Sequence, residues 1–212
     1  MLFSLFSVTL AILGARLGSA STSPDFLPAV AEDLQMFYGT TQVQPPGVTL
    51  SEATVANVPT LYASTYLDTS TRYAVIMVDY NVDLSGVQTT ILQWFQPDLS
   101  AASPDGKLSI ASGSSAPSAS YISPAPNAGP AHQYVTILYK QPADYELPAC
   151  LDGVLPAGNN RAGFNLQQFA GVAGLGDPIA ANWFAVQDPT PATTTYQITA
   201  TSTASYACAT TA

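Results

Sequence analysis

The chain has 212 residues, of which 47% are hydrophobic and only 9% are charged, with Lys+Arg 5 against Asp+Glu 14 and a formal net charge of −9. Nucleic-acid binding requires cationic side chains that neutralise phosphates, so this balance argues against that class. The same shortage of Lys and Arg excludes a polybasic membrane-binding patch. The length suits one domain with a sizeable core.

Residues 1–20 have the pattern of a secretory signal peptide. The apolar run from Leu2 to Leu13 is about half as long as the ~20 residues that a membrane-spanning helix needs. Small residues follow it, with Gly18 and Ala20 placed as signal peptidase prefers. No basic residue precedes the run, so a buried N-terminal helix or an uncleaved anchor is the alternative. We expect cleavage after Ala20, a secreted protein, and no transmembrane segment.

The first elements after this signal are expected between residues 25 and 64. Apolar residues three and four apart predict a short amphipathic helix from Asp25 to Tyr38. Residues 48–64 are expected to be extended, with an interruption at Pro59.

Four later segments are dense in β-branched and aromatic residues. They predict strands at Arg72 to Val82, Val87 to Phe95, Tyr134 to Lys140, and Ile179 to Gln187. The segment Pro97 to Pro130 is rich in Ser, Pro, Ala and Gly and is too long for an ordinary turn, so it predicts a functional or a disordered loop.

A short helix is predicted from Asn165 to Ala173. Asn165 can cap its N-terminus, Gln168 stands at the third helical position, and Gly174 stands where a C-terminal cap belongs. We expect one domain over residues 21–190, followed by a tail at residues 191–212 that is rich in Ser, Thr and Ala.

Two cysteines, Cys150 and Cys208, occur in the chain. In an oxidising compartment such a pair predicts one disulfide, which would tether the tail to the domain. Two unpaired buried thiols are the alternative interpretation. A metal site is not expected, because two Cys and the single His132 lack any ligand spacing.

Catalytic patterns are scarce. The sequence has no Gly-x-Ser-x-Gly elbow, no His-Glu-x-x-His, and one histidine to act as a base. Asp79 and Asp83 could act as an acid–base pair, but solvated acids at a strand end explain them better. No motif indicates a cofactor. The sequence therefore favours a binding protein over an enzyme.

Four segments in this order resemble the phosphatidylethanolamine-binding protein family, most closely the secreted branch found in fungi. They are Val78-Asp79-Tyr80-Asn81, Leu92-Gln93-Trp94, Ser123-Pro124-Ala125-Pro126 with His132-Gln133-Tyr134, and Arg161 to Ala180, which includes Gly174-Leu175-Gly176-Asp177-Pro178. Each segment alone is a weak signal. The resemblance covers the chain from about residue 72 to residue 187.

The resemblance implies a mainly β fold, in which a large central antiparallel sheet packs with a smaller sheet and short helices lie near the C-terminus. It also implies a small surface cavity for phosphate, phosphoryl-ethanolamine or acetate-like anions. Residues that match the family's cavity are Asp79, Pro124, Pro126, His132 and Tyr134.

Two positions depart from the family pattern. Asn81 stands where a second aspartate is expected, and Gln93 stands where a first histidine is expected. An amide N–H of Gln93 can replace one imidazole donor, but it cannot supply its charge. We therefore expect Gln93 in the cavity and weaker anion binding, and a vestigial cavity is the alternative.

The leading hypothesis is a secreted, non-catalytic protein that binds a small anion or a phospholipid head group. A modulator of another protein, such as an extracellular protease, is a second hypothesis. A wall or matrix protein with O-linked sugars on its Ser/Thr-rich stretches is a third.

Overall fold

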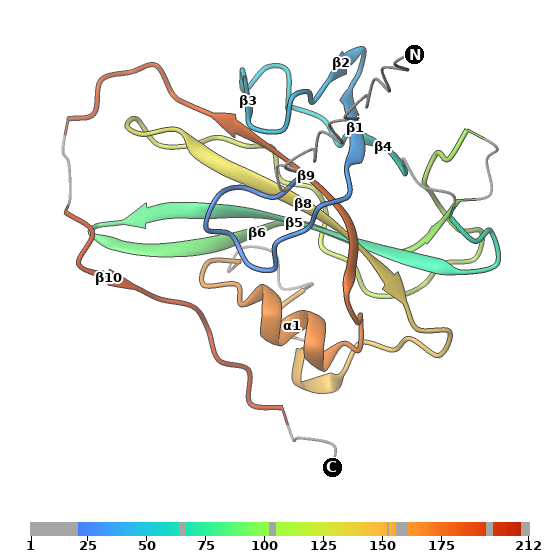
Figure 1. The fold of residues 1–212 in the computed structure, drawn as a ribbon. Coiled ribbons are helices and arrows are strands. Elements are labelled where there is room, and N and C mark those ends of the chain that lie inside the picture. The colour runs from blue at the N-terminus through green and yellow to red at the C-terminus, as the bar shows by residue number, and fades with distance from the viewer. Residues whose placement is uncertain are drawn as a thin grey trace, which may run out of the picture.

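A computed structural model describes residues 21–63, 67–101, 105–151, 153–155, 161–193 and 197–208. Within these ranges the structure has two β-sheets, one α-helix and a short 3-10 helix, η1 Ala149–Leu151, and the α-helix lies against one face of the larger sheet (Figure 1). The expected signal peptide, residues 1–20, lies outside the described residues. The mainly β fold that the resemblance implied is present.

The larger sheet has seven strands. Six of them follow the order β10-β6-β5-β8-β9-β3, and β7 pairs with the C-terminal end of β6. Its centre is antiparallel, whereas β3 and β10 pair in parallel with their neighbours. The four predicted strands are its central members. Their bounds are β5 Arg72–Leu84, β6 Val87–Ser100, β8 His132–Gln141 and β9 Pro178–Val186, and the outer strands are β3 Val48–Leu50, β7 Ser109–Ile110 and β10 Ala200–Thr201.

The smaller sheet has the order β2-β1-β4 and consists of β1 Leu34–Tyr38, β2 Thr41–Gln42 and β4 Thr60–Ala63. The predicted helix from Asp25 to Tyr38 is therefore wrong. Leu34, Met36 and Tyr38 are buried on one face of β1 and alternate with less buried residues, which is the period of a strand. The apolar residues of this segment fit both a helical and a strand period, and pairing with β4 selected the strand.

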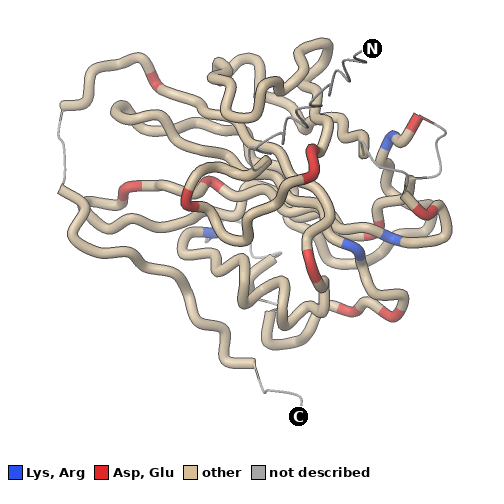
Figure 2. The backbone as a smooth tube through the Cα atoms, in the orientation of Figure 1, with Lys and Arg blue, Asp and Glu red and all other residues tan. Residues whose placement is uncertain are grey.

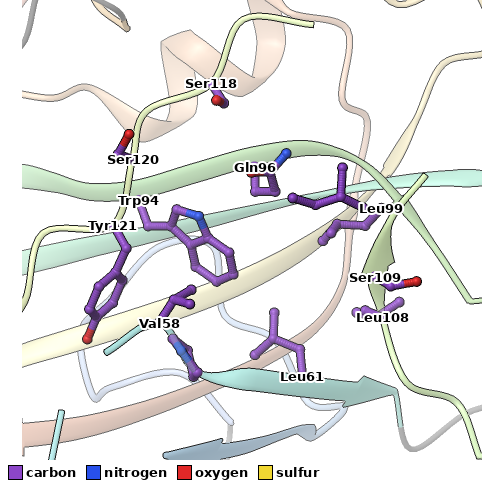
Figure 3. A pocket seen from close by; sticks show the side chains of 12 residues that line it. Val58, Leu61, Trp94, Gln96, Leu99, Leu108, Ser109, Ser118, Ser120 and Tyr121 are labelled. Atoms are coloured by element: carbon purple, nitrogen blue, oxygen red, sulfur yellow. The ribbon is translucent and has the colours of Figure 1, made fainter. Parts of the chain in front are cut away.

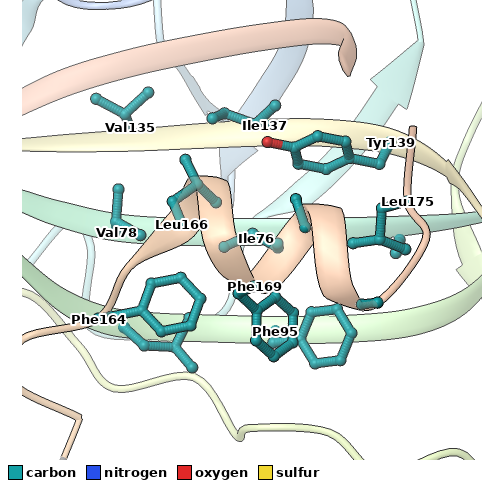
Figure 4. Packing of buried hydrophobic residues seen from close by; sticks show 14 of the residues in the cluster. Ile76, Val78, Phe95, Val135, Ile137, Tyr139, Phe164, Leu166, Phe169 and Leu175 are labelled. Carbon is teal, nitrogen blue, oxygen red and sulfur yellow. The ribbon is translucent and has the colours of Figure 1, made fainter. Parts of the chain in front are cut away.

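Each face of the large sheet carries its own apolar core. Ile76, Phe95 and Ile137 face the helix side, where α1 Leu166–Val172 inserts Phe169 between them (Figure 4). The opposite face holds the second cluster, with the small sheet packed against it through residues such as Leu34 of β1. This burial on both faces explains why β5 is an almost continuous apolar run.

The predicted loop from Pro97 to Pro130 begins later than expected. Pro97 to Ser100 still belongs to β6, and Ser109–Ile110 forms β7, which pairs back onto β6. The content of Ser, Pro, Ala and Gly had placed the start of the loop at Pro97. Tertiary pairing extends the strand past it. The rest of the described loop has no helix or strand.

The helix α1 has the predicted N-cap, because the Asn165 side chain accepts a hydrogen bond from Gln168 N at 3.1 Å. The Gln168 amide instead binds the tail, donating to Tyr206 O and accepting from Tyr206 N, both at 2.8 Å. The predicted disulfide Cys150–Cys208 is formed, with a Cα–Cα distance of 5.3 Å. These contacts and β10 hold the described part of the tail against the domain.

Charged side chains are few and lie mostly toward strand ends and loops (Figure 2). Within the described ranges, no helix combines the length and the apolar composition that a membrane crossing requires. The same ranges contain no group of three His, Cys, Asp or Glu residues that could hold a metal ion.

Candidate ligand-binding site

Three adjacent strands carry the polar residues of the candidate site. Asp79 lies on β5, Gln93 on β6, and His132 and Tyr134 on β8, and β5 is the middle strand of the three. Tyr134 is the cross-strand partner of Asp79. Side chains two residues apart share a face of a sheet, so His132 and Tyr134 both lie on the face that Asp79 occupies.

Asp79 and His132 form a buried pair. Asp79 Oδ2 lies 2.8 Å from His132 Nδ1, and the two residues are only 3% and 9% exposed. An ionised carboxylate can only accept, so Nδ1 carries the shared hydrogen and the carboxylate sets the tautomer of the ring. His132 Nε2 is then an acceptor when the ring is neutral and a donor when the ring is protonated.

Tyr134 is buried beside this pair, with its ring stacked on Phe184 at 5.3 Å between centroids. Burial raises the pKa of the Tyr134 phenol far above its ordinary value, and the charge of Asp79 raises it further. The phenol is therefore neutral at physiological pH and can act as a hydrogen-bond donor.

Two buried acceptors in this region have no donor among the described residues. They are Asp79 Oδ1 and Gln93 Oε1. A buried acceptor without a donor costs about 1–3 kcal/mol, so such atoms mark a place where a bound molecule's N–H or O–H groups would be stabilising. The arrangement thus offers a donor at His132 and an acceptor at Asp79 Oδ1, with the Tyr134 phenol close to the same carboxylate and Gln93 on the adjacent strand β6.

Gln93 lies at an irregularity of the β5–β6 pairing. Met77 pairs with Trp94 and Val78 pairs with Leu92, so Gln93 is the extra residue of a bulge. Its carbonyl accepts hydrogen bonds from Ile122 N at 2.8 Å and from Arg161 Nη1 at 3.3 Å. Bulges change the direction in which side chains point. Here the backbone of the bulge is held by hydrogen bonds from Ile122 and Arg161, which lie outside the strands of the sheet.

Arg161 belongs to the fourth matching segment, and its described contacts are structural. Its Nη1 also donates to Ser120 O at 2.6 Å, so the guanidinium joins the bulge to the segment before β8. Partial burial lowers the pKa of Arg161 from its ordinary value. We did not expect this role from the sequence.

His132 lines a cavity of about 300 Å³ at the end of the sheet. The loop before β8 and the start of the tail form its other walls, and no Lys or Arg is among its described lining residues. The lining residues are Asn81, Asp83, Gln88, Asn127, Ala128, Gly129, Pro130, His132, Ala192 and Ile198. Any positive charge that the lining side chains give this cavity comes from protonated His132.

The six residues expected in one cavity are brought together only in part. Asp79, His132 and Tyr134 are neighbours, and Gln93 lies on the strand next to Asp79. Of the six, His132 alone belongs to the lining of the 300 Å³ cavity. Pro124 and Pro126 are buried in the segment that precedes β8.

Asn81 was identified as a departure from the family pattern, and the structure gives it a supporting role. Its Oδ1 accepts from Gln133 N at 2.7 Å, and its Nδ2 donates to Ala131 O at 3.3 Å. The side chain therefore holds the chain on both sides of His132. An aspartate could make the first hydrogen bond but not the second.

Gln88 and residues 127–130, which form walls of the cavity, were not predicted from the sequence. The local signal was present, because a Gly-Pro pair directly before a strand marks a sharp loop. The tail also lines the cavity, through Ala192 and Ile198. No sequence pattern predicts this, because it depends on the path of the tail along the edge of the sheet.

Comparisons with known proteins agree with these observations. The family model described as phosphatidylethanolamine-binding protein matches residues 31–188. The phomoidride biosynthesis cluster protein N of Talaromyces stipitatus is 35% identical over 194 residues, which cover 85% of this chain and 96% of that protein. A 26 kDa secreted antigen of Toxocara canis is 32% identical over 143 residues, covering 66% of this chain and 51% of that protein.

Solved structures show the same fold at low identity. A phosphatidylethanolamine-binding protein from Plasmodium vivax matches with a TM-score of 0.57 and 18% identity, covering 77% of this chain and 91% of that one. A carboxypeptidase Y inhibitor, solved in complex with its cognate proteinase, matches with a TM-score of 0.55 and 18% identity, covering 75% and 84%. The extent of the family match and the identity to its relatives show that the chain belongs to the phosphatidylethanolamine-binding protein family.

Proposed function

We propose that the protein is a non-catalytic binding protein for a small molecule that carries both an anionic group and a hydrogen-bond donor, such as a phosphoryl-ethanolamine head group. One observation carries this proposal: in the buried Asp79–His132 pair, the second carboxylate oxygen, Asp79 Oδ1, makes no hydrogen bond among the described residues, and the same holds for Gln93 Oε1 on the adjacent strand β6.

The two halves of such a ligand have separate partners. Protonated His132 would donate from Nε2 to the anionic group, since Nδ1 is committed to Asp79. An ammonium or hydroxyl group of the ligand would donate to the unpaired acceptors. An anion without a donor would leave Asp79 Oδ1 and Gln93 Oε1 unpaired, so it should bind more weakly.

The contacts of His132 favour binding over nucleophilic catalysis. A histidine base activates a Ser, Thr or Cys within hydrogen-bond reach, whereas the side-chain hydrogen bond found for His132 in the described structure goes to Asp79. The name of the Talaromyces relative, a biosynthesis cluster protein, supports a small organic molecule as the ligand. A carboxylate could then take the place of the phosphate.

Calorimetric titration tests the proposal with four probes: phosphoethanolamine, inorganic phosphate, ethanolamine and acetate. We expect phosphoethanolamine to bind most tightly of the four probes, because it alone combines a phosphate with an ammonium group. His132→Ala should abolish binding of both phosphate probes. Asp79→Asn should remove the advantage of phosphoethanolamine over phosphate. Equal affinities for these two probes in the wild type would contradict the proposed ligand class.

An extracellular protease is the second candidate partner. Residues 111–118, between β7 and the segment that leads to β8, are mostly exposed and could provide a contact surface. The fold is shared with a carboxypeptidase Y inhibitor, which supports this candidate. It would take first place if none of the four probes binds and the secreted protein inhibits a serine carboxypeptidase. A wall or matrix role would instead show as O-linked sugar in the secreted protein.

We also propose that the protein is secreted. The disulfide fits an oxidising compartment, and a relative is named as a secreted antigen. N-terminal sequencing of the protein from culture medium should begin at Ser21. A sequence that begins at Met1 would contradict cleavage.

A further inference from the structure

A second cavity, of about 390 Å³, lies between the small sheet and the large sheet. Leu61 of β4 and Trp94 of β6 face each other across it, and the segments near Leu108 and Tyr121 close its sides (Figure 3). It shares no lining residue with the cavity that His132 lines. Ligand sites typically have volumes of about 300–1,000 Å³, so the space can hold a small molecule.

Most residues that line this second cavity are apolar, and its polar lining residues, Gln96, Ser109, Ser118 and Ser120, are uncharged. Leu61, Leu99, Leu108 and Trp94 are the buried members of the lining, and no Asp, Glu, Lys, Arg or His is among its described residues. Val58 and Ile110 at the cavity are 53% and 58% exposed. An ionic ligand would lose its hydration here without gaining a partner, so the lining selects neutral, mainly apolar molecules.

The indole N–H of Trp94 makes no hydrogen bond to another described residue, and Nε1 is not one of the fully buried unpaired polar atoms of the described structure. The N–H is therefore open to a molecule that enters the cavity. The nitrogen lies on the edge of the ring that faces Gln96 (Figure 3). Gln96 Nε2 is a donor and binds Pro97 O at 2.9 Å, and no hydrogen bond joins Trp94 Nε1 to the Gln96 acceptor Oε1 in the described structure. An oxygen acceptor on a bound molecule would give this N–H a partner.

The polar groups around Trp94 are held in place before any ligand arrives. Tyr121 packs edge-to-face against the indole, with ring centroids 6.3 Å apart. The Tyr121 hydroxyl is turned away from the cavity, toward Val55 O at 2.7 Å. The ring wall is therefore preformed, which lowers the cost of ordering on binding.

We propose that this cavity is a second binding site, specific for a neutral, largely apolar molecule whose carbonyl oxygen accepts a hydrogen bond from Trp94 Nε1. Flat aromatic ketones and esters have this chemistry. The site is independent of the anion site, because it needs neither His132 nor a change of charge.

Fluorescence titration with prodan, a neutral naphthyl ketone, tests the site. We expect saturable binding with a blue-shifted emission, and no binding of the anionic dye anilinonaphthalene sulfonate. Val58→Trp should abolish prodan binding by filling the mouth of the cavity. Leu84→Trp is the matched control, since Leu84 is also exposed and apolar but lies at the far end of β5.

The hydrogen bond is tested by a double cycle. Trp94→Phe should weaken prodan binding about fivefold, the equivalent of one hydrogen bond. It should leave the affinity for the prodan analogue without the propionyl group unchanged, because that analogue has no carbonyl acceptor. His132→Ala should bind prodan like the wild type, which separates this proposal from the anion site.

Three results would overturn the proposal. The first is that Val58→Trp leaves the affinity for prodan unchanged. The second is that the Leu84→Trp control reduces prodan binding as much as Val58→Trp does. The third is that Trp94→Phe weakens the binding of prodan and of its analogue equally. Tight binding of the sulfonate dye at the same cavity would contradict its specificity for neutral molecules.

Discussion

Asp79 and His132 are 53 positions apart in the sequence, and their side chains meet at 2.8 Å because β5 and β8 are adjacent and antiparallel. The register pairs Asp79 with Tyr134, which leaves His132 diagonal to Asp79 on the same face. Diagonal cross-strand pairs lie within reach of long and ring side chains. A slip of one residue in this register would move the aspartate to the opposite face of the sheet.

Gln93→His should tighten phosphate binding at about pH 5.5, because a second imidazole adds a donor that can be charged. The same substitution in a His132→Ala background should restore part of the lost binding if both rings face one ligand. Calorimetric titration with inorganic phosphate measures both effects. If Gln93→His binds phosphate no better than the wild type, position 93 does not face the anion.

Asn81→Asp should destabilise the protein by about 1 kcal/mol, because the carboxylate cannot replace the hydrogen bond from Nδ2 to Ala131 O. Asn81→Ala should cost more, since it also removes the acceptor for Gln133 N. Urea unfolding monitored by tryptophan fluorescence gives both values. A variant Asn81→Asp as stable as the wild type would mean that Asn81 does not hold the segment around His132.

Removal of the Cys150–Cys208 disulfide by the double substitution to serine should lower stability by up to about 4 kcal/mol, as expected for a closed loop of 58 residues. Denaturant unfolding with and without reductant measures the loss, and the double variant should no longer respond to reductant. Thiol labelling of the unfolded, unreduced wild type checks the pairing itself. Two labelled thiols would contradict it.

The unfolding free energy should fall as the pH rises above about 10. Burial raises the pKa of Tyr121 and of Tyr145 from 10.0 to about 12. A raised phenol pKa means that the folded state holds the proton more tightly, so this contribution is complete below pH 10.0 and is lost as the pH rises toward 12. Unfolding measured at several alkaline pH values tests the loss.

Two phenylalanine variants separate the hydroxyls. Tyr121→Phe should cost about 1 kcal/mol at neutral pH, because Tyr121 donates to Val55 O. Tyr145→Phe should not destabilise at neutral pH, since its buried hydroxyl has no partner among the described residues. In both variants the unfolding free energy should fall less steeply with pH above about 10. If it falls as steeply in both variants as in the wild type, groups other than these two phenols cause the loss of stability.

Local sequence patterns predicted the strands that are buried on both faces and the helix with a recognisable N-cap. The central strands β5, β6, β8 and β9 are apolar and β-branched over their length because both faces of the sheet are covered, and such runs are recognisable in one sequence. The helix α1 was predictable from its Asn165 cap. Two cysteines in a chain that begins with an expected signal peptide predicted the disulfide, which the structure contains.

Pairing between distant segments decided the rest. Leu34 to Tyr38 fits a helical and a strand period, and contact with β4 selected the strand. The walls of the His132 cavity combine a loop, a hairpin end and the tail, which no local pattern links. Asn81 and Trp94 acquire their roles only through neighbours far along the chain. Sequence alone predicted burial where a long apolar run leaves no other choice, as in β5, because both faces of such a strand must be covered. The tertiary structure decides which polar atoms find partners, because partners depend on strand register and on the path of the tail.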